Sequence, residues 1–151
     1  MPRSYIPVGI KRIVKERAYG CCEYCFAPED HATETFEIEH IIPLSKGGTS
    51  EPNNLALSCS GCNSRKYNRT EALDPINDEM VALYNPRLHN WVEHYSWSPD
   101  YTLLIAHTSI ARATINALGT NRTQLVNMRL LLYSAGKHPP KFMDGYSRHK
   151  I

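Results

Sequence analysis

Four of the five cysteines form two Cys-x-x-Cys pairs, a spacing typical of metal binding. Cys22 pairs with Cys25, Cys59 pairs with Cys62, and 33 residues lie between the two pairs. Two thiolates separated by two residues at a tight turn can reach one tetrahedral Zn²⁺ ion. We therefore predict a Cys₄ zinc site. Cys21 could replace Cys22, but the Cys-x-x-Cys spacing favours Cys22.

A second group of reactive side chains lies between the cysteine pairs and just beyond them. An acid precedes a histidine at Glu39-His40, Asn54 follows His40 by 14 residues, and Asn63 follows Asn54 by nine. An imidazole titrates near neutral pH and can act as a general base. Carboxylate and amide oxygens are ligands that a hard divalent cation prefers. Lys66, one helical turn beyond Asn63, could meet a phosphate.

In this order and at these intervals, residues 22–66 resemble the HNH endonuclease family. The resemblance implies a ββα-metal core, with an acid–histidine pair on a strand, a loop with a fixed asparagine, and a histidine or asparagine on the helix. It also implies DNA cleavage that leaves a 5′-phosphate and a 3′-hydroxyl. The matching residues are Glu39-His40, Gly47-Gly48, Asn54, and Cys59, Cys62, Asn63 and Lys66.

Hydrolysis of a phosphodiester needs a deprotonated water and a cation that relieves charge on the phosphoryl oxygens. We predict that His40 is the general base and that Glu39 and Asn63 hold one Mg²⁺ or Mn²⁺ ion. As the resemblance implies, Asn54 would brace the loop and orient the base. Neighbours on a regular strand point to opposite faces, so Glu39 and His40 share a site only where the strand bends. Glu37 is therefore an alternative ligand.

The elements that must position these residues can be read from hydrophobic periodicity. Residues 35–42 alternate polar and apolar side chains, which predicts a half-buried strand that ends at Pro43. A short polar helix is expected with Asn63 near its start. We interpret residues 74–80 as a connector. Three further helices are expected at 7–18, 109–118 and 121–135.

The net charge of +2 conceals a segregation of charge along the chain. Residues 1–20, 63–70 and 102–151 are basic, whereas residues 21–62 hold Lys46 against seven acids. This distribution suits a protein that binds a polyanion while holding a cation, although blocks of charge also arise by chance. The predicted nucleic-acid contacts are Lys66, Arg65, Arg69, Lys11 and Arg12.

The predicted fold is a small α+β domain in which a ββα-metal core is tied together by the Cys₄ zinc site. We expect one domain over residues 1–151, with the core at 20–70, a helical extension at 71–140 and a loose basic tail at 141–151. The zinc is predicted to be structural, because four thiolates leave no open coordination position. No apolar run is long enough to cross a bilayer and the first residues lack a signal-peptide pattern, so we expect a cytoplasmic protein.

Two other classes of function remain open from the sequence. A non-catalytic zinc module that binds nucleic acid would keep the cysteines and the basic segments, but it has no need of His40, Asn54 and Asn63 together. A Cys-x-x-Cys thiol oxidoreductase would show thiol-sensitive activity and contain no stoichiometric zinc.

Overall fold

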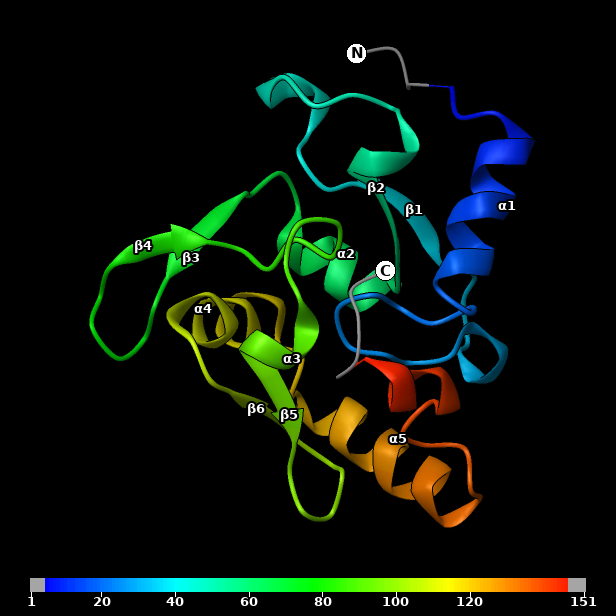
Figure 1. The fold of residues 1–151 in the computed structure, drawn as a ribbon, viewed down its shortest axis with the longest axis vertical. Helices are drawn as coiled ribbons and strands as arrows, with labels where there is room; N and C mark the ends of the chain where they lie inside the picture. The colour runs from blue at the N-terminus through cyan, green and yellow to red at the C-terminus, as the bar shows by residue number, and fades with distance from the viewer. Residues whose placement is uncertain (1–4, 147–151) are drawn as a thin grey trace.

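A β-hairpin followed by a short helix forms the centre of the protein, for which a computed structural model describes residues 5–146. Strand β1 (Glu37–His40) pairs antiparallel with β2 (Leu55–Ser58), and helix α2 (Ser60–Lys66) follows directly. Helix α1 (Val8–Arg17) runs beside the hairpin, where it contacts β2, while α2 contacts β1 (Figure 1). The predicted ββα core and the α+β fold class are therefore confirmed.

The strand that carries the acid–histidine pair is shorter than predicted, because β1 covers only residues 37–40. Its register with β2 is regular: Glu39 lies opposite Ala56 and His40 lies opposite Leu55. All four residues of β2 are buried. Strand β2 is thus enclosed in the protein, while β1 carries the polar side chains.

The far edge of β2 is also paired, although no strand within residues 5–146 lies there. The backbone N–H of Glu23 donates to the Leu57 carbonyl, and the Leu57 N–H donates to Glu23 Oε2, both at 2.9 Å. Arg17 Nη2 donates to the Leu55 carbonyl at 2.6 Å. Because buried backbone groups need partners, these contacts fix α1 and the first cysteine pair against the hairpin.

Three of the four predicted helices have nearly the expected bounds, and α2 differs. It begins at Ser60, inside the second cysteine pair, with Cys59 as its N-cap, so Asn63 lies in the middle of the helix rather than near its start. The helices that agree are α1, α4 (Ser109–Leu118) and α5 (Thr123–Ser134).

None of the helices within residues 5–146 is long and apolar enough to span a membrane.

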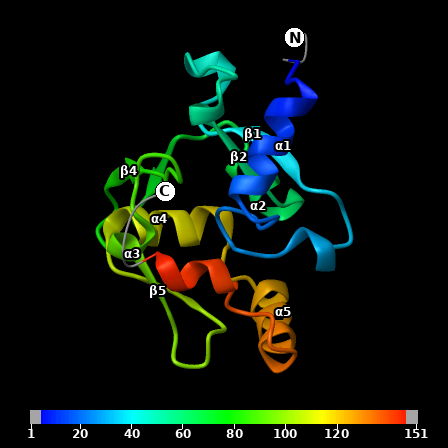
Figure 2. The ribbon, with the colours of Figure 1, turned by 45° about the vertical axis from the view of Figure 1, so that its right-hand side comes forward.

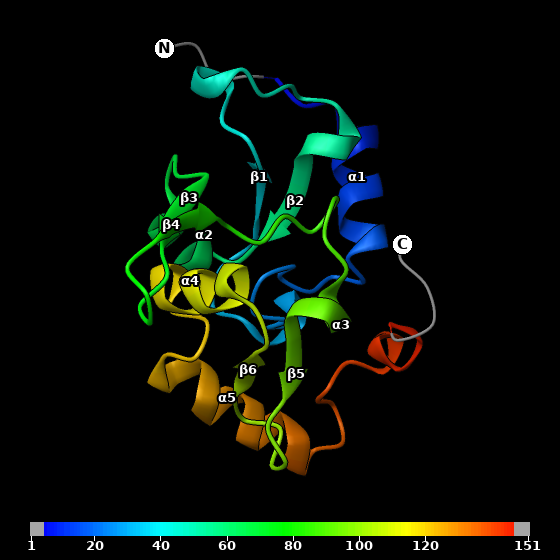
Figure 3. The same ribbon diagram turned by 60° about the vertical axis from the view of Figure 1, so that its left-hand side comes forward.

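Residues 71–106, where no strand was predicted, form two further hairpins that are well separated in Figure 3. The expected connector at 74–80 contains the turn of the first one. Asp74 in that turn is fully buried, and its carboxylate accepts from Arg112 Nη2 of α4 at 2.6 Å. The strands are β3 (Glu71–Leu73) with β4 (Met80–Ala82), and β5 (Tyr95–Trp97) with β6 (Leu104–Ala106), the second pair preceded by α3 (Trp91–His94).

One buried cluster of apolar side chains extends from Ile6 to Leu125 and joins the hairpin to the C-terminal helices. Arg129 of α5 adds a polar link. It is only 2% exposed, and its guanidinium donates to the carbonyls of Cys25 at 3.2 Å and Thr120 at 2.6 Å. These contacts tie α5 to the first cysteine pair and to the turn before α5.

The segment predicted to be a loose tail is partly ordered. Residues Lys141–Gly145 form a short 3₁₀ helix, η4, drawn in red in Figure 2. Phe142 stacks on Tyr19 with ring centroids 4.5 Å apart. The basic composition predicted a solvated tail, but Phe142 and Tyr146 pack against aromatic side chains of the core, so the chain is held in place up to residue 146. The remaining predicted tail, 147–151, lies outside the described residues.

Candidate active site

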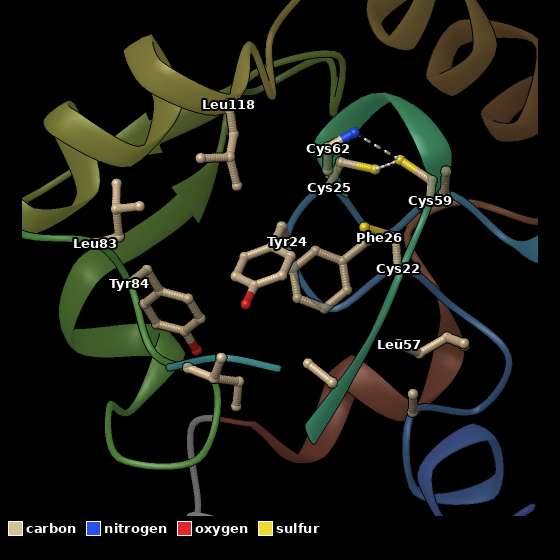
Figure 4. Packing of buried hydrophobic residues seen from close by; sticks show 14 of the residues in the cluster. Cys22, Tyr24, Cys25, Phe26, Leu57, Cys59, Cys62, Leu83, Tyr84 and Leu118 are labelled. Carbon is tan, nitrogen blue, oxygen red and sulfur yellow. Dashed lines mark hydrogen bonds between the residues drawn. The ribbon is translucent and has the colours of Figure 1, made fainter. Parts of the chain in front are cut away.

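The four cysteines of the two pairs meet in one buried cluster, in which all four sulfurs lie within 4.8 Å of one another. Figure 4 shows the two pairs converging from the loop after α1 and from the start of α2. Cys25 Sγ and Cys59 Sγ are 3.7 Å apart. Tetrahedral zinc with Zn–S bonds of about 2.3 Å separates its sulfurs by about 3.8 Å, whereas a disulfide needs about 2.05 Å. The donor set and its spacing therefore fit zinc.

Cys21 lies outside this cluster, as the spacing predicted. It is buried, and its thiol donates to the Tyr19 carbonyl at 3.7 Å. The predicted choice of Cys22 over Cys21 is confirmed, because Cys22 belongs to the set of grouped sulfurs.

A guanidinium lies against the cysteine cluster. Arg122 donates to Cys59 Sγ and Cys62 Sγ, each at 3.7 Å. Burial raises the pKa of Cys22 well above that of an ordinary thiol, so thiolates at this position need nearby positive charge. Gly61 leaves room for the arginine, since a Cβ there would lie 2.4 Å from Arg122 Nη2. Sequence spacing could not reveal a contact made across 60 residues.

His40 lies at the end of β1 and is half-buried. Its Nε2 is 2.9 Å from Ser50 Oγ, in the loop that joins the two strands. Burial, and secondly the positive charge of Lys66, lower the pKa of His40 from 6.5. The imidazole is therefore neutral at pH 7, which is the protonation state that a general base requires.

Asn54 holds the loop that faces His40. Its Oδ1 accepts from the Ile42 N–H at 2.9 Å, and its Nδ2 donates to the carbonyls of Ile42 at 2.9 Å and Thr49 at 2.8 Å. Gly48 makes this closure possible, because a Cβ there would lie 1.8 Å from the Ile42 carbonyl oxygen. The bracing contacts predicted for Asn54 are present, and they fix the backbone just after His40.

Glu39 faces the protein interior. Its side chain is 4% exposed, its Oε2 lies 3.1 Å from Lys66 Nζ, and its Oε1 accepts from the hydroxyl of buried Tyr24. Burial raises the pKa of Glu39, and the Lys66 ammonium and the Tyr24 hydroxyl partly offset this effect. Lys66 also donates to the Ile41 carbonyl at 2.8 Å, so it ties α2 to the end of β1.

Two site predictions need correction here. Lys66 was expected to contact phosphate, but it is 1% exposed and is committed to Glu39 and to backbone carbonyls. Glu39 was expected to share a cation with Asn63, but both of its oxygens are engaged and a buried ammonium lies beside them. Because β1 pairs regularly, Glu39 and His40 point to opposite faces of the strand. The alternative ligand, Glu37, is exposed.

The remaining predicted contact residues lie at or near the surface. Asn63 is half-buried in the middle of α2, one turn before Lys66. Lys11 and Arg12 are exposed on α1, as is Arg65 on α2. Arg69 instead turns toward the protein and donates to the carbonyls of Arg65 at 2.6 Å and Ala117 at 3.3 Å.

The central part of the chain matches a known family. The HNH endonuclease family model aligns with residues 22–69. Residues 22–69 are an HNH endonuclease domain. A search of curated proteins gave no significant match. The HNH segment contains both cysteine pairs, the hairpin and α2. The family implies a metal-dependent nuclease whose substrate is nucleic acid.

Several residues that support the HNH segment were not identified from the sequence. Tyr24, within the first cysteine pair, holds Glu39, and Glu23 beside it forms an ion pair with Arg87, 64 residues later. Arg17 of α1 donates to the carbonyls of Pro52 and Leu55 at 2.6 Å. Their residue types offered no motif, because each role depends on a contact between distant parts of the chain.

Proposed function

We propose that the protein is a metal-dependent DNA endonuclease in which His40 is the general base. The observation that carries this proposal is a half-buried imidazole of lowered pKa, at the end of β1, beside a loop closed by Asn54. This geometry lies inside the segment that matches HNH endonucleases. A neutral imidazole can take a proton from the attacking water, which becomes the nucleophile at phosphorus.

The residues around His40 act by positioning it. The Ser50 hydroxyl contacts Nε2 and limits rotation of the ring. Asn54 fixes the backbone at Ile42, two residues after the histidine. Lys66 is a positioning residue as well. Its ammonium donates to the carbonyls of Ile41 and His40, and its positive charge lies near the imidazole.

The fit of a catalytic cation is incomplete in this arrangement. A bound Mg²⁺ or Mn²⁺ would supply charge relief at the phosphoryl oxygens. Asn63 could offer its side-chain carbonyl oxygen, a donor suited to such an ion. Glu39 does not fit this role, because its carboxylate is neutralised by Lys66. We therefore propose Asn63 as the protein ligand and assign Glu39 to the positioning of α2.

The cysteine cluster is proposed to hold a structural zinc ion. Its four thiolates complete a tetrahedron and leave no position for substrate. The ion would join the loop after α1 to the start of α2, which in turn carries Asn63 and Lys66. Since this small core buries little apolar area, a metal crosslink is an effective source of stability.

Plasmid cleavage with added Mg²⁺ or Mn²⁺ tests the proposal. We expect wild-type protein to nick or linearise the plasmid and to leave 5′-phosphate ends, and we expect His40→Ala to be about 10²–10⁴ times slower. His107→Ala, which changes an exposed histidine elsewhere, is the matched control and should cut normally. Equal rates of cleavage by wild type and His40→Ala would contradict the assignment of His40 as the general base. No cleavage by either protein would favour the non-catalytic nucleic-acid-binding alternative.

A further inference from the structure

A cavity of about 290 Å³ lies between the end of α1, which contributes Arg17, and the start of α3, which contributes Trp91. Its polar wall includes Arg17, Glu23 and Arg87, and its aromatic wall includes Tyr84 and Trp91. Natural ligand pockets begin at about 300 Å³, so this volume suits a single small ligand rather than a larger molecule.

Three residues that line this cavity each have a side-chain N–H donor that is buried without an acceptor in the part of the chain that the structure describes. The donors belong to Arg17 (Nε), Arg87 (Nε) and Trp91 (Nε1). Trp91 is only 8% exposed. A buried donor without an acceptor is costly and is rare in native structures. Three of the six buried side-chain atoms that lack a partner within the described residues belong to residues that line this one cavity, which favours a ligand with hydrogen-bond acceptors there.

The charges of the cavity favour an anionic ligand. The wall carries two guanidinium groups but only one carboxylate. Arg87 forms an ion pair with Glu23, whereas Arg17 donates to backbone carbonyls. The two arginines and Glu23 together carry a formal charge of +1. Burial lowers the pKa of Arg17, and the positive charge of the neighbouring Arg87 lowers it further.

The cavity adjoins the turn that holds the proposed general base. Asn53 lines it and immediately precedes Asn54. Arg17, on its wall, donates to the carbonyl of Leu55, and Leu55 is the residue opposite His40 in the hairpin. Adjacent strands lie about 4.8 Å apart. A nucleic-acid strand bound at His40 could therefore place a neighbouring nucleotide in this cavity.

From these observations we propose that the cavity binds one unpaired nucleotide of the substrate strand, with the base against Trp91 and Tyr84 and the phosphate at Arg17 and Arg87. Aromatic side chains bind unstacked bases in this way, with stacking worth about 1–3 kcal/mol per base. The proposal extends the proposed nuclease function by assigning it a preference for a substrate with an unpaired or extruded nucleotide near the cleaved bond.

The test uses ¹⁵N-labelled full-length protein titrated with each of the four deoxynucleoside 5′-monophosphates. We expect the indole N–H signal of Trp91 to shift saturably. Trp97 provides a comparison one shell further out, because its ring centroid lies 6.0 Å from that of Trp91 but it does not line the cavity. Its signal should move less.

The matched variant is Glu23→Gln/Arg87→Gln, which removes the opposite charges of the ion pair together. We expect it to weaken mononucleotide binding about tenfold, whereas Lys137→Gln, an exposed change elsewhere, should have no effect. The absence of a saturable shift, or equal shifts of both indoles, would overturn the proposal. So would equal binding of inorganic phosphate or of the uncharged nucleoside, since each lacks one half of the nucleotide.

Failure of this proposal and failure of the nuclease proposal are distinguishable. A mononucleotide contains no phosphodiester bond to cleave, so its binding does not depend on catalysis. If plasmid is cleaved but mononucleotides do not bind, the cavity proposal alone is wrong. If mononucleotides bind but His40→Ala leaves cleavage unchanged, the cavity proposal stands and the assignment of the general base is wrong.

Discussion

The cysteine cluster and the His40 region arise from the same short stretch of chain, yet they are built in opposite ways. The four cysteines are buried, and their sulfurs lie within 4.8 Å of one another. His40 is half-buried at a strand end, beside a loop that is held from behind by Asn54. This difference fits the two proposed roles. The cysteine cluster would stabilise the fold, and the His40 region would leave its imidazole accessible to substrate.

Disruption of the cysteine cluster should have the largest effect on stability. We expect Cys22→Ser to lose zinc and to abolish cooperative unfolding, because metal binding and folding are coupled in small zinc domains. Elemental analysis and thermal unfolding followed by circular dichroism measure both effects. Cys21→Ser is the matched control, since Cys21 is also buried but lies outside the cluster. Equal stability of the two variants would contradict a structural zinc site.

Separation of the buried ion pair should have the next largest effect. Lys66→Met leaves the Glu39 carboxylate buried without its cation, which should lower the free energy of unfolding by about 3–5 kcal/mol. Glu39→Gln/Lys66→Met removes both charges and should recover most of this loss. Urea unfolding of the two variants tests the comparison. If the double variant is as unstable as Lys66→Met, the ion pair is not the source of the effect.

A smaller effect is expected at Gly48, where the loop closes on Asn54. Gly48→Ala would place a methyl group against the Ile42 carbonyl, so the loop must move, at a cost of about 1–3 kcal/mol. The displaced loop should also slow cleavage. Gly145→Ala meets nothing within 4 Å and serves as the control. Wild-type stability and activity in Gly48→Ala would show that this closure does not position His40.

The sequence predicted best the features that are encoded locally. The Cys-x-x-Cys spacing identified all four cysteines of the cluster, and hydrophobic periodicity predicted the range of α4, residues 109–118. The hairpins within 71–106 were missed because their strands are only three residues long, too short for alternation to be visible.

The side-chain partners inside the site could be predicted only in part. Asn54 was expected to brace the loop and does so, because an asparagine at a turn bonds to nearby backbone. Lys66 was expected to meet a phosphate because it lies one helical turn beyond Asn63, yet it is buried and contacts Glu39, 27 residues earlier. The contacts of Arg17, Arg87 and Arg122 depend on tertiary structure in the same way.

The most direct test of the account is the pH dependence of kcat/KM for DNA cleavage. Protonation removes the general base, so the rate should fall as the pH drops through the pKa of His40. Because burial and Lys66 lower this pKa, the midpoint should lie below 6.5 in the wild type and should move upward in Glu39→Gln/Lys66→Met. A midpoint above 6.5, or the same acid limb in His40→Ala, would contradict the assignment of His40 as the base.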